Sequence, residues 1–259
     1  MDFPLDRTGA RRPRARTVAL ALAAALGAPA LAHAHVEAVT NCNDSGAGSL
    51  RDAVANSSTD DTIDLSALAC GTITLTSGAI VVTHNALTLN GPGEDVLTID
   101  GYFADRVFMH QGIGTLRLVG LTVADGKYVS DTSPNGGCIR SNGNVELISS
   151  AVTDCYVKGI DDSYAEGGGV FTLRDLSMLA SRVTGNTVRA TGSGLTPAGG
   201  GGALASGRLY IKYSTVSGNA VYSEGDHVSS GGGLVARNYS TIAYSTIAGN
   251  YAQFDGGVV

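Results

Sequence analysis

The stretch "GGGVFTLRDLSMLASRVTGN" (167–186) decides the fold, because the chain repeats its outline four times. Each copy opens with a Gly-rich phrase, continues through short apolar runs and closes at an Asn or a Cys. The third residue of the Gly phrase and the closing residue are always 17 positions apart: Cys138 to Cys155, Gly169 to Asn186, Gly202 to Asn219 and Gly233 to Asn250. Such regular recurrence is typical of a solenoid, in which each repeat forms one coil.

A β-branched residue three positions before the closing residue anchors each copy. Including one weaker, earlier copy, the anchors recur at intervals of 29, 31, 33 and 31 residues: Val123, Val152, Val183, Val216 and Ile247. An apolar residue lies five positions before every anchor. A Ser lies two positions before four of them: Ser150, Ser181, Ser214 and Ser245. The pattern predicts that equivalent side chains stack from coil to coil.

The chain between one closing residue and the next Gly phrase varies in length. These variable stretches hold 11, 13, 11 and 5 residues: 156–166, 187–199, 220–230 and 251–255. Coils that stack need a constant length, whereas a loop that leaves the stack tolerates insertions. We therefore expect the variable stretches to form outward turns on one side of the molecule.

The constant half of each repeat is typical of β-strands. Runs such as "RLYIKYSTV" (208–216) and "TIAYSTI" (241–247) are rich in β-branched and aromatic residues and are bounded by Gly and Asn. Similar runs continue upstream over 72–123, and no helix-length segment separates them, which excludes a βαβ sheet. The sequence predicts an all-β chain, with parallel β-helix repeats over 72–259.

The N-terminal end of such a stack needs a cover, because an open end exposes unpaired backbone and core. The segment "SLRDAVANS" (49–57) has the features of a short capping helix. Ser49 and Asp52 resemble a capping box, and Leu50, Ala53 and Val54 give the helix one apolar face. We expect residues 35–71 to form this cap and the first coil.

Residues 1–34 have the features of a secretory signal peptide. Five Arg residues precede an apolar run at 17–31, and Ala32-His33-Ala34 supplies a small-x-small cleavage pattern. Cleavage after Ala34 would remove five Arg and two Asp, so the net charge of −6 would become −9 (−6 − 5 + 2). We expect an exported protein without a later membrane-spanning segment, and the acidic charge argues against nucleic acid as a partner.

The four cysteines are Cys42, Cys70, Cys138 and Cys155. Export makes them candidates for two disulfides, and four cysteines allow three pairings. Their order favours Cys42–Cys70 and Cys138–Cys155, although the order alone does not exclude the other two pairings.

Gly and Asn in the repeat have structural explanations. Gly permits the positive φ angles that tight corners need, and Asn tolerates the left-handed region. An Asn amide can also bond the equivalent amide one coil away. We expect Asn186, Asn219 and Asn250 to form such a ladder, which makes the repeated phrase structural rather than catalytic.

The segment 39–68 resembles the start of a large group of secreted bacterial right-handed β-helix proteins. Four short motifs carry the resemblance: VTN (39–41), DSG (44–46), SLRD (49–52) and DTI (61–63). The later repeats are similar to those of polymorphic outer membrane proteins, in which a Gly-Gly-Ala-aliphatic phrase alternates with Phe-x-x-Asn; Val or Ile replaces the Phe here. The resemblance implies a right-handed β-helix, secreted or on the surface of a bacterium, often an adhesin-like passenger.

Autotransporters of this group carry a C-terminal barrel, and "GGVV" (256–259) looks like the start of a further repeat. We therefore expect the repeats to be C-terminally incomplete, with a barrel or an anchor possible downstream.

The variable stretches are the predicted binding face, for a glycan or a surface protein. They collect Tyr and charged side chains, which suit recognition. The candidate residues are Tyr156, Asp161, Asp162, Tyr164, Glu166, Tyr222, Glu224, Asp226 and Tyr251.

A polysaccharide lyase or hydrolase is the alternative function, because many parallel β-helices are such enzymes. Their chemistry needs two placed carboxylates, or an acidic Ca²⁺ cluster with a base. The pair Asp60-Asp61 lies in the cap motif and the pair Asp161-Asp162 in a variable stretch, so no catalytic constellation is recognisable and we predict no enzyme. No cofactor or metal is expected either; a weak Ca²⁺ site at Asp161, Asp162 and Glu166 is the alternative to a solvated turn.

Overall fold

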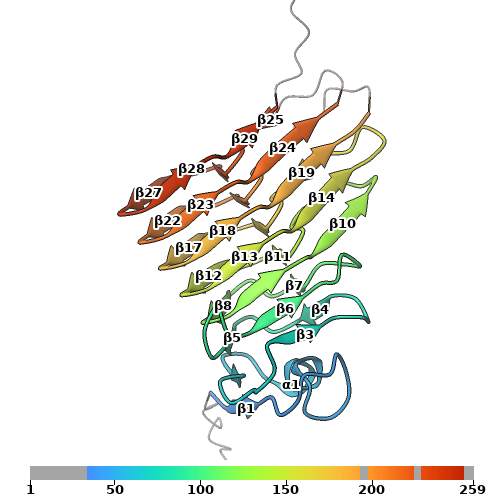
Figure 1. Cartoon of the computed structure of the whole chain (residues 1–259), viewed down its shortest axis with the longest axis vertical. Helices are drawn as coiled ribbons and strands as arrows, with labels where there is room; N and C mark the ends of the chain where they lie inside the picture. Colours follow the sequence, from blue (N-terminus) through green and yellow to red (C-terminus); the bar gives the residue numbers. More distant parts are fainter. Residues whose placement is uncertain (1–33, 193–197, 225–228, 254–259) are drawn as a thin grey trace, which may run out of the picture. The chain divides into compact units, whose positions relative to one another are not determined.

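The computed structural model describes residues 34–192, 198–224 and 229–253 (Figure 1). The expected signal peptide lies outside these residues apart from Ala34. The unit that begins at Ala34 is a stack of β-strand coils, and every strand pair in its described part is parallel. The predicted parallel β-helix is confirmed.

Three sheets build the body of the solenoid. Sheet A contains β1 (Val36–Ala38), β2 (Thr62–Asp64), β5 (Leu87–Asn90), β8 (Thr115–Val119), β12 (Asn144–Ile148), β17 (Leu176–Leu179), β22 (Leu209–Lys212) and β27 (Ser240–Ala243). Sheet B contains β3 (Thr72–Thr74), β6 (Thr98–Asp100), β9 (Thr122–Ala124), β13 (Ala151–Thr153), β18 (Arg182–Thr184), β23 (Thr215–Ser217) and β28 (Thr246–Ala248). Sheet C contains β4 (Ile80–Val82), β7 (Phe108–His110), β11 (Ile139–Ser141), β16 (Val170–Thr172), β21 (Ala203–Ala205) and β26 (Leu234–Ala236).

Two further sheets project from the body. Sheet D contains β10 (Lys127–Ser130), β14 (Tyr156–Gly159), β19 (Thr187–Ala190), β24 (Ala220–Ser223) and β29 (Tyr251–Ala252). Sheet E contains β15 (Ala165–Glu166), β20 (Ala198–Gly199) and β25 (Ser229–Ser230). A complete coil follows the order C, A, B, D and E, so that sheets A and D lie on opposite sides of sheet B in Figure 1.

The core consists of equivalent side chains stacked from coil to coil. On sheet B, Val152 pairs in register with Val183, which pairs with Val216, and all three are buried. On sheet A, Leu147, Met178 and Ile211 form the same kind of column. In these stacked coils the apolar side chains thus leave water, and this burial is the main force that holds the stack together.

The variable stretches differ from the expected turns, because each complete stretch contains two strands. Each complete stretch begins with a strand of sheet D and ends with a strand of sheet E. A second buried cluster fills the space between these two sheets: Val157, Ala165, Val188, Ala190, Ala198 and Val221. The lengths vary in the connection between the two strands. We call the two sheets with their connections the wing.

The closing residues form a ladder at the junction between body and wing. Asn186 Nδ2 donates to Asn219 Oδ1 at 2.9 Å, and Asn219 Nδ2 donates to Asn250 Oδ1 at 2.9 Å. The backbone N–H of Cys155 donates to Asn186 Oδ1 at 3.0 Å. The four repeat serines add a parallel row, in which a backbone N–H donates to the hydroxyl one coil further: Ser150 to Ser181, Ser181 to Ser214 and Ser214 to Ser245.

The Gly phrases leave room for the ladder. A Cβ on Gly169 would lie 2.9 Å from Cγ of Asn186, and one on Gly168 would lie 2.2 Å from the carbonyl oxygen of Gly201. In the first copy, Cys138 and Cys155 occupy the Gly and Asn positions and lie at disulfide distance, with Cα atoms 5.5 Å apart. The predicted pairing of these cysteines is confirmed.

The predicted helix is present as α1 (Leu50–Asn56). The hydroxyl of Ser49 accepts a hydrogen bond from the backbone N–H of Asp52 at 3.2 Å, and the Asp52 carboxylate accepts one from the backbone N–H of Gly48 at 3.0 Å. Leu50, Ala53 and Val54 are buried in the core beside the first strands. Cys42 and Cys70 also lie at disulfide distance, as predicted, with Cα atoms 6.4 Å apart.

Candidate functional site

The outward side of sheet D carries aromatic and basic side chains in two rows. The alternation of the strands turns Val157, Val188 and Val221 inward and leaves their neighbours, apart from the buried Ala220, on the outside. The register defines the first row as Lys127, Tyr156, Thr187, Ala220 and Tyr251. It defines the second row as Val129, Lys158, Arg189 and Tyr222. We call these two rows, together with Phe103, the D face.

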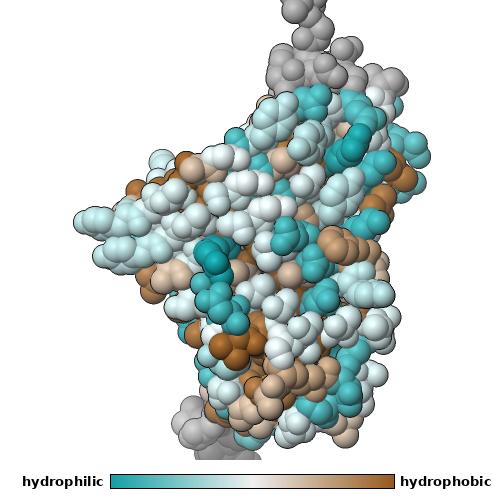
Figure 2. All heavy atoms as spheres, viewed as in Figure 1, coloured by the Kyte–Doolittle hydropathy of each residue, from teal (hydrophilic) through white to brown (hydrophobic). Residues whose placement is uncertain are grey.

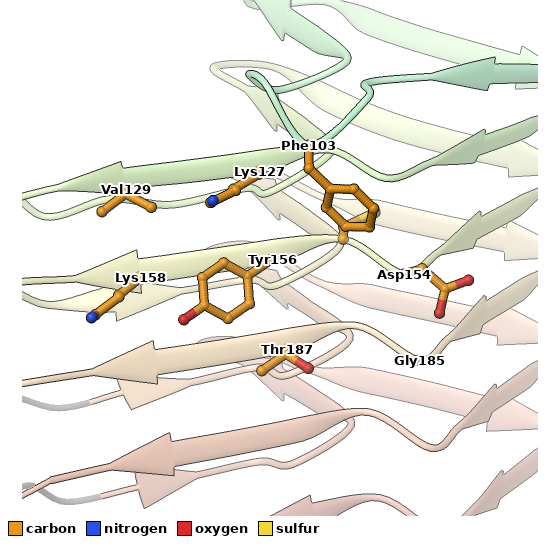
Figure 3. A pocket seen from close by; sticks show the side chains of 9 residues that line it. Phe103, Lys127, Val129, Asp154, Tyr156, Lys158, Gly185 and Thr187 are labelled. Atoms are coloured by element: carbon orange, nitrogen blue, oxygen red, sulfur yellow. The ribbon is translucent and has the colours of Figure 1, made fainter. Parts of the chain in front are cut away.

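An open cavity of about 750 Å³ lies at the β10 end of the D face. Phe103, Lys127, Tyr156 and Lys158 contribute to its lining (Figure 3), and Asp154 is the acidic residue that lines it. Phe103 belongs to the loop between β6 and β7, and its backbone N–H donates to the carbonyl oxygen of Asp125 at 2.7 Å. This bond holds the loop against the segment between β9 and β10, and the ring, which is 53% exposed, lies beside β14.

The opposite end of the D face carries a second aromatic pair. The ring centroids of Tyr222 and Tyr251 lie 5.7 Å apart with the rings tilted by 48°. Between the two aromatic ends lie Lys158 and Arg189, which are register partners. Figure 2 shows hydrophobic side chains interleaved with hydrophilic ones on the side of the molecule in view. Ligand-binding sites commonly combine apolar and polar groups in this way.

The charges on the D face are unevenly neutralised. Arg189 forms an ion pair with Glu224, with Arg189 Nε 3.1 Å from Glu224 Oε1, and this hydrogen bond lowers the pKa of Glu224. Lys127 and Lys158 form no ion pair with any described residue. Burial raises the pKa of Tyr156, and a tyrosine hydroxyl can both donate and accept a hydrogen bond.

The sequence-predicted binding residues divide into two groups. Tyr156, Tyr222 and Tyr251 lie on the D face, and Glu224 follows β24 as the ion-pair partner of Arg189. The remaining candidates lie elsewhere: Asp161 and Asp162 in the exposed connection after β14, Tyr164 and Glu166 by sheet E, and Asp226 outside the described residues.

Tyr164 and Glu166 line a smaller cavity of about 180 Å³. Glu166 forms an ion pair with Arg237, which comes from a later coil and also lines this cavity. Asp161 and Asp162 both have positive φ angles, of 55° and 64°. The variable stretches therefore do not form one surface.

Sequence reasoning missed Phe103, Lys127, Lys158 and Thr187. The sequence does carry a signal for Lys127, Thr187 and Lys158. Lys127 and Thr187 lie four positions after an anchor, as the predicted Tyr156 does, and Lys158 lies six positions after one. Extending the repeat into the variable stretch would have revealed both rows. Phe103 carried no such signal, because its loop belongs to a coil that lacks a strand of sheet D.

The described residues contain no group of three or more His, Cys, Asp and Glu side chains that could hold a metal ion. Nor does any helix in the described ranges have the length and apolar character needed to cross a membrane. No family model, no curated protein and no solved structure matches the chain. The resemblance to polymorphic outer membrane proteins therefore stays a prediction from the sequence motifs.

Proposed function

We propose that this protein is an exported β-helix that binds a glycan on the D face. The observation that carries the proposal is the set of side chains around the 750 Å³ cavity: two aromatic rings, Phe103 and Tyr156, with Lys127, Lys158 and Thr187 beside them. Aromatic rings pack against the apolar faces of sugars, while the polar groups bond to hydroxyl or acidic substituents.

The architecture supports this role. The D face repeats its rows at each coil, about 4.8 Å apart, and an extended polymer also repeats its units along its length. The Asn ladder and the Cys138–Cys155 disulfide cross-link the chain where the wing begins, which restrains the D face before binding. Rigid presentation lowers the entropic cost of binding.

The predicted signal peptide and the two cysteine pairs support export. A surface-exposed or secreted adhesin-like module fits these features, and we propose a right-handed coil, the sense that parallel crossover connections almost always adopt. In this proposal α1 covers the N-terminal end of the stack.

A glycan array probed with the full chain tests the proposal. We expect binding that Tyr156→Ala abolishes and that Tyr239→Ala leaves intact, because Tyr239 is 78% exposed but lies beside sheet A. Equal binding by the parent and by Tyr156→Ala would contradict the assignment of the site.

A second candidate is a polysaccharide-cleaving enzyme. Burial raises the pKa of Asp125, and the neighbouring carboxylates Asp100 and Asp154 raise it further. Glycoside hydrolysis uses a pair of carboxylic acid side chains, and Asp154 lines the cavity. Release of reducing ends that Asp154→Asn stops would establish this activity; binding without turnover favours the first candidate.

A further inference from the structure

We infer that the D face selects an anionic polysaccharide, one that bears carboxylate or sulfate groups, and that the polymer lies across the strands along the stack of coils. The inference rests on the proposed glycan binding and adds the class and direction of the ligand.

The basic residues of the D face carry the inference. Lys127, Lys158 and Arg189 come from three successive strands, β10, β14 and β19, on the same side of sheet D. The whole chain has a net charge of −6, so three basic side chains gathered on one small face run against its overall balance. Glu224 neutralises Arg189 and Asp154 lines the cavity, whereas Lys127 and Lys158 have no ion-pair partner among the described residues.

The direction of the ligand follows from the register. Lys158 and Arg189 are direct partners on neighbouring strands, and Lys127 pairs with Tyr156, which lies two residues before Lys158. Each of the strands β10, β14 and β19 contributes one cation to the D face. A polymer that runs across the strands can therefore place its acidic groups, which recur once or twice per repeating unit, beside several of these cations. A polymer that lay along a single strand would meet at most one of these cations.

In the structure, Glu224 occupies the side of Arg189 to which we expect an acidic group of the polymer to bind. Both side chains are about half exposed, at 46% and 52%, and exposed ion pairs contribute little stability. Lys158 also lies close enough to lower the pKa of Glu224. An acidic substituent of the polymer can therefore displace Glu224 and take its bond to Arg189. Removing the Glu224 charge should strengthen binding.

Titration of the full chain with matched polysaccharides tests the inference. Dextran sulfate is compared with dextran, and polygalacturonate with its methyl ester, because each pair differs in the acidic group. We expect the acidic member of at least one pair to bind at least about tenfold more tightly, since hydrogen bonds to charged groups are the stronger ones. Added salt should weaken that binding. Sulfate-only or carboxylate-only binding identifies the source of the anion.

Three variants separate the possible results. Lys158→Gln should lose about tenfold in affinity for the acidic polymer, and Glu224→Gln should gain several-fold, a gain that misfolding cannot produce. Lys212→Gln, an exposed lysine on sheet A, should change nothing. If the acidic and the neutral polysaccharide of each pair bound with equal affinity, the inference would be overturned and the proposed function would stand. Binding to none of the four polymers would overturn the inference, and an empty glycan array would overturn the proposed function as well.

Discussion

Replacing Asn219 by Ala removes the centre of the ladder between body and wing. Asn219 is fully buried, and its side chain takes part in four hydrogen bonds. Its Nδ2 donates to the Val183 carbonyl oxygen and to Asn250 Oδ1, both at 2.9 Å. Its Oδ1 accepts from Asn186 N at 3.0 Å and from Asn186 Nδ2 at 2.9 Å.

The cost follows from the groups left without partners. In Asn219→Ala the backbone N–H of Asn186 loses its acceptor and the carbonyl of Val183 loses this donor, both inside the structure. Each buried group left unsatisfied costs about 1–3 kcal/mol, so we expect the free energy of unfolding to fall by about 2–6 kcal/mol. Asn250→Ala should cost less, because Asn250 is only partly buried and water can replace it.

Urea denaturation followed by circular dichroism measures the change. Asn238→Ala serves as the matched control, because Asn238 is exposed and, among the described residues, its side chain bonds only the adjacent backbone N–H of Tyr239. The control should shift stability by no more than about 0.5 kcal/mol. If Asn219→Ala behaved like this control, the ladder would not stabilise the stack and the reasoning would be refuted.

Three further predictions concern the same body and wing. Replacing both Cys138 and Cys155 by Ala should lower the free energy of unfolding by about 3 kcal/mol, the value for a loop of this size; denaturation unchanged from the parent would argue against the bond. Burial lowers the pKa of His110, so stability should fall as pH drops below the ordinary value of about 6.5, and His110→Gln should flatten that dependence when unfolding is measured between about pH 5 and pH 7; an identical pH profile would contradict this. Gly168→Ala should destabilise the chain by several kcal/mol because its Cβ meets a carbonyl oxygen at 2.2 Å, whereas Gly71→Ala, with its nearest atom at 3.8 Å, should be tolerated in a thermal melt; equal melting temperatures would be inconsistent with the packing described.

The body of the fold could be predicted because its spacing is constant. A residue that stacks on its equivalent must recur at the same position of every coil, and Val152, Val183 and Val216 do so. The order of the cysteines gave the correct pairing for a related reason, since Cys138 and Cys155 occupy the two positions that Gly169 and Asn186 occupy one coil later.

The wing could not be predicted as well, because its lengths vary and its strands are short. The varying length of these stretches indicated turns throughout. In the structure, only the connection between β14 and β15, and the equivalent connections in later coils, varies in length. The position of Phe103 depends on a loop from another coil, so no local pattern announces it. The proposed binding surface therefore combines a periodic part, visible in the sequence, with a part that only the fold brings into place.

Hydroxyl-radical footprinting of the full chain, with and without saturating dextran sulfate or polygalacturonate, tests the proposed binding most directly. We predict that the bound polymer protects Phe103 and Tyr156 from oxidation. Tyr239 and Tyr244, which are exposed beside sheet A, should remain as reactive as in the free protein. Protection of Tyr239 and Tyr244 with no change at Phe103 and Tyr156 would place the ligand on the other side of the solenoid and contradict the account.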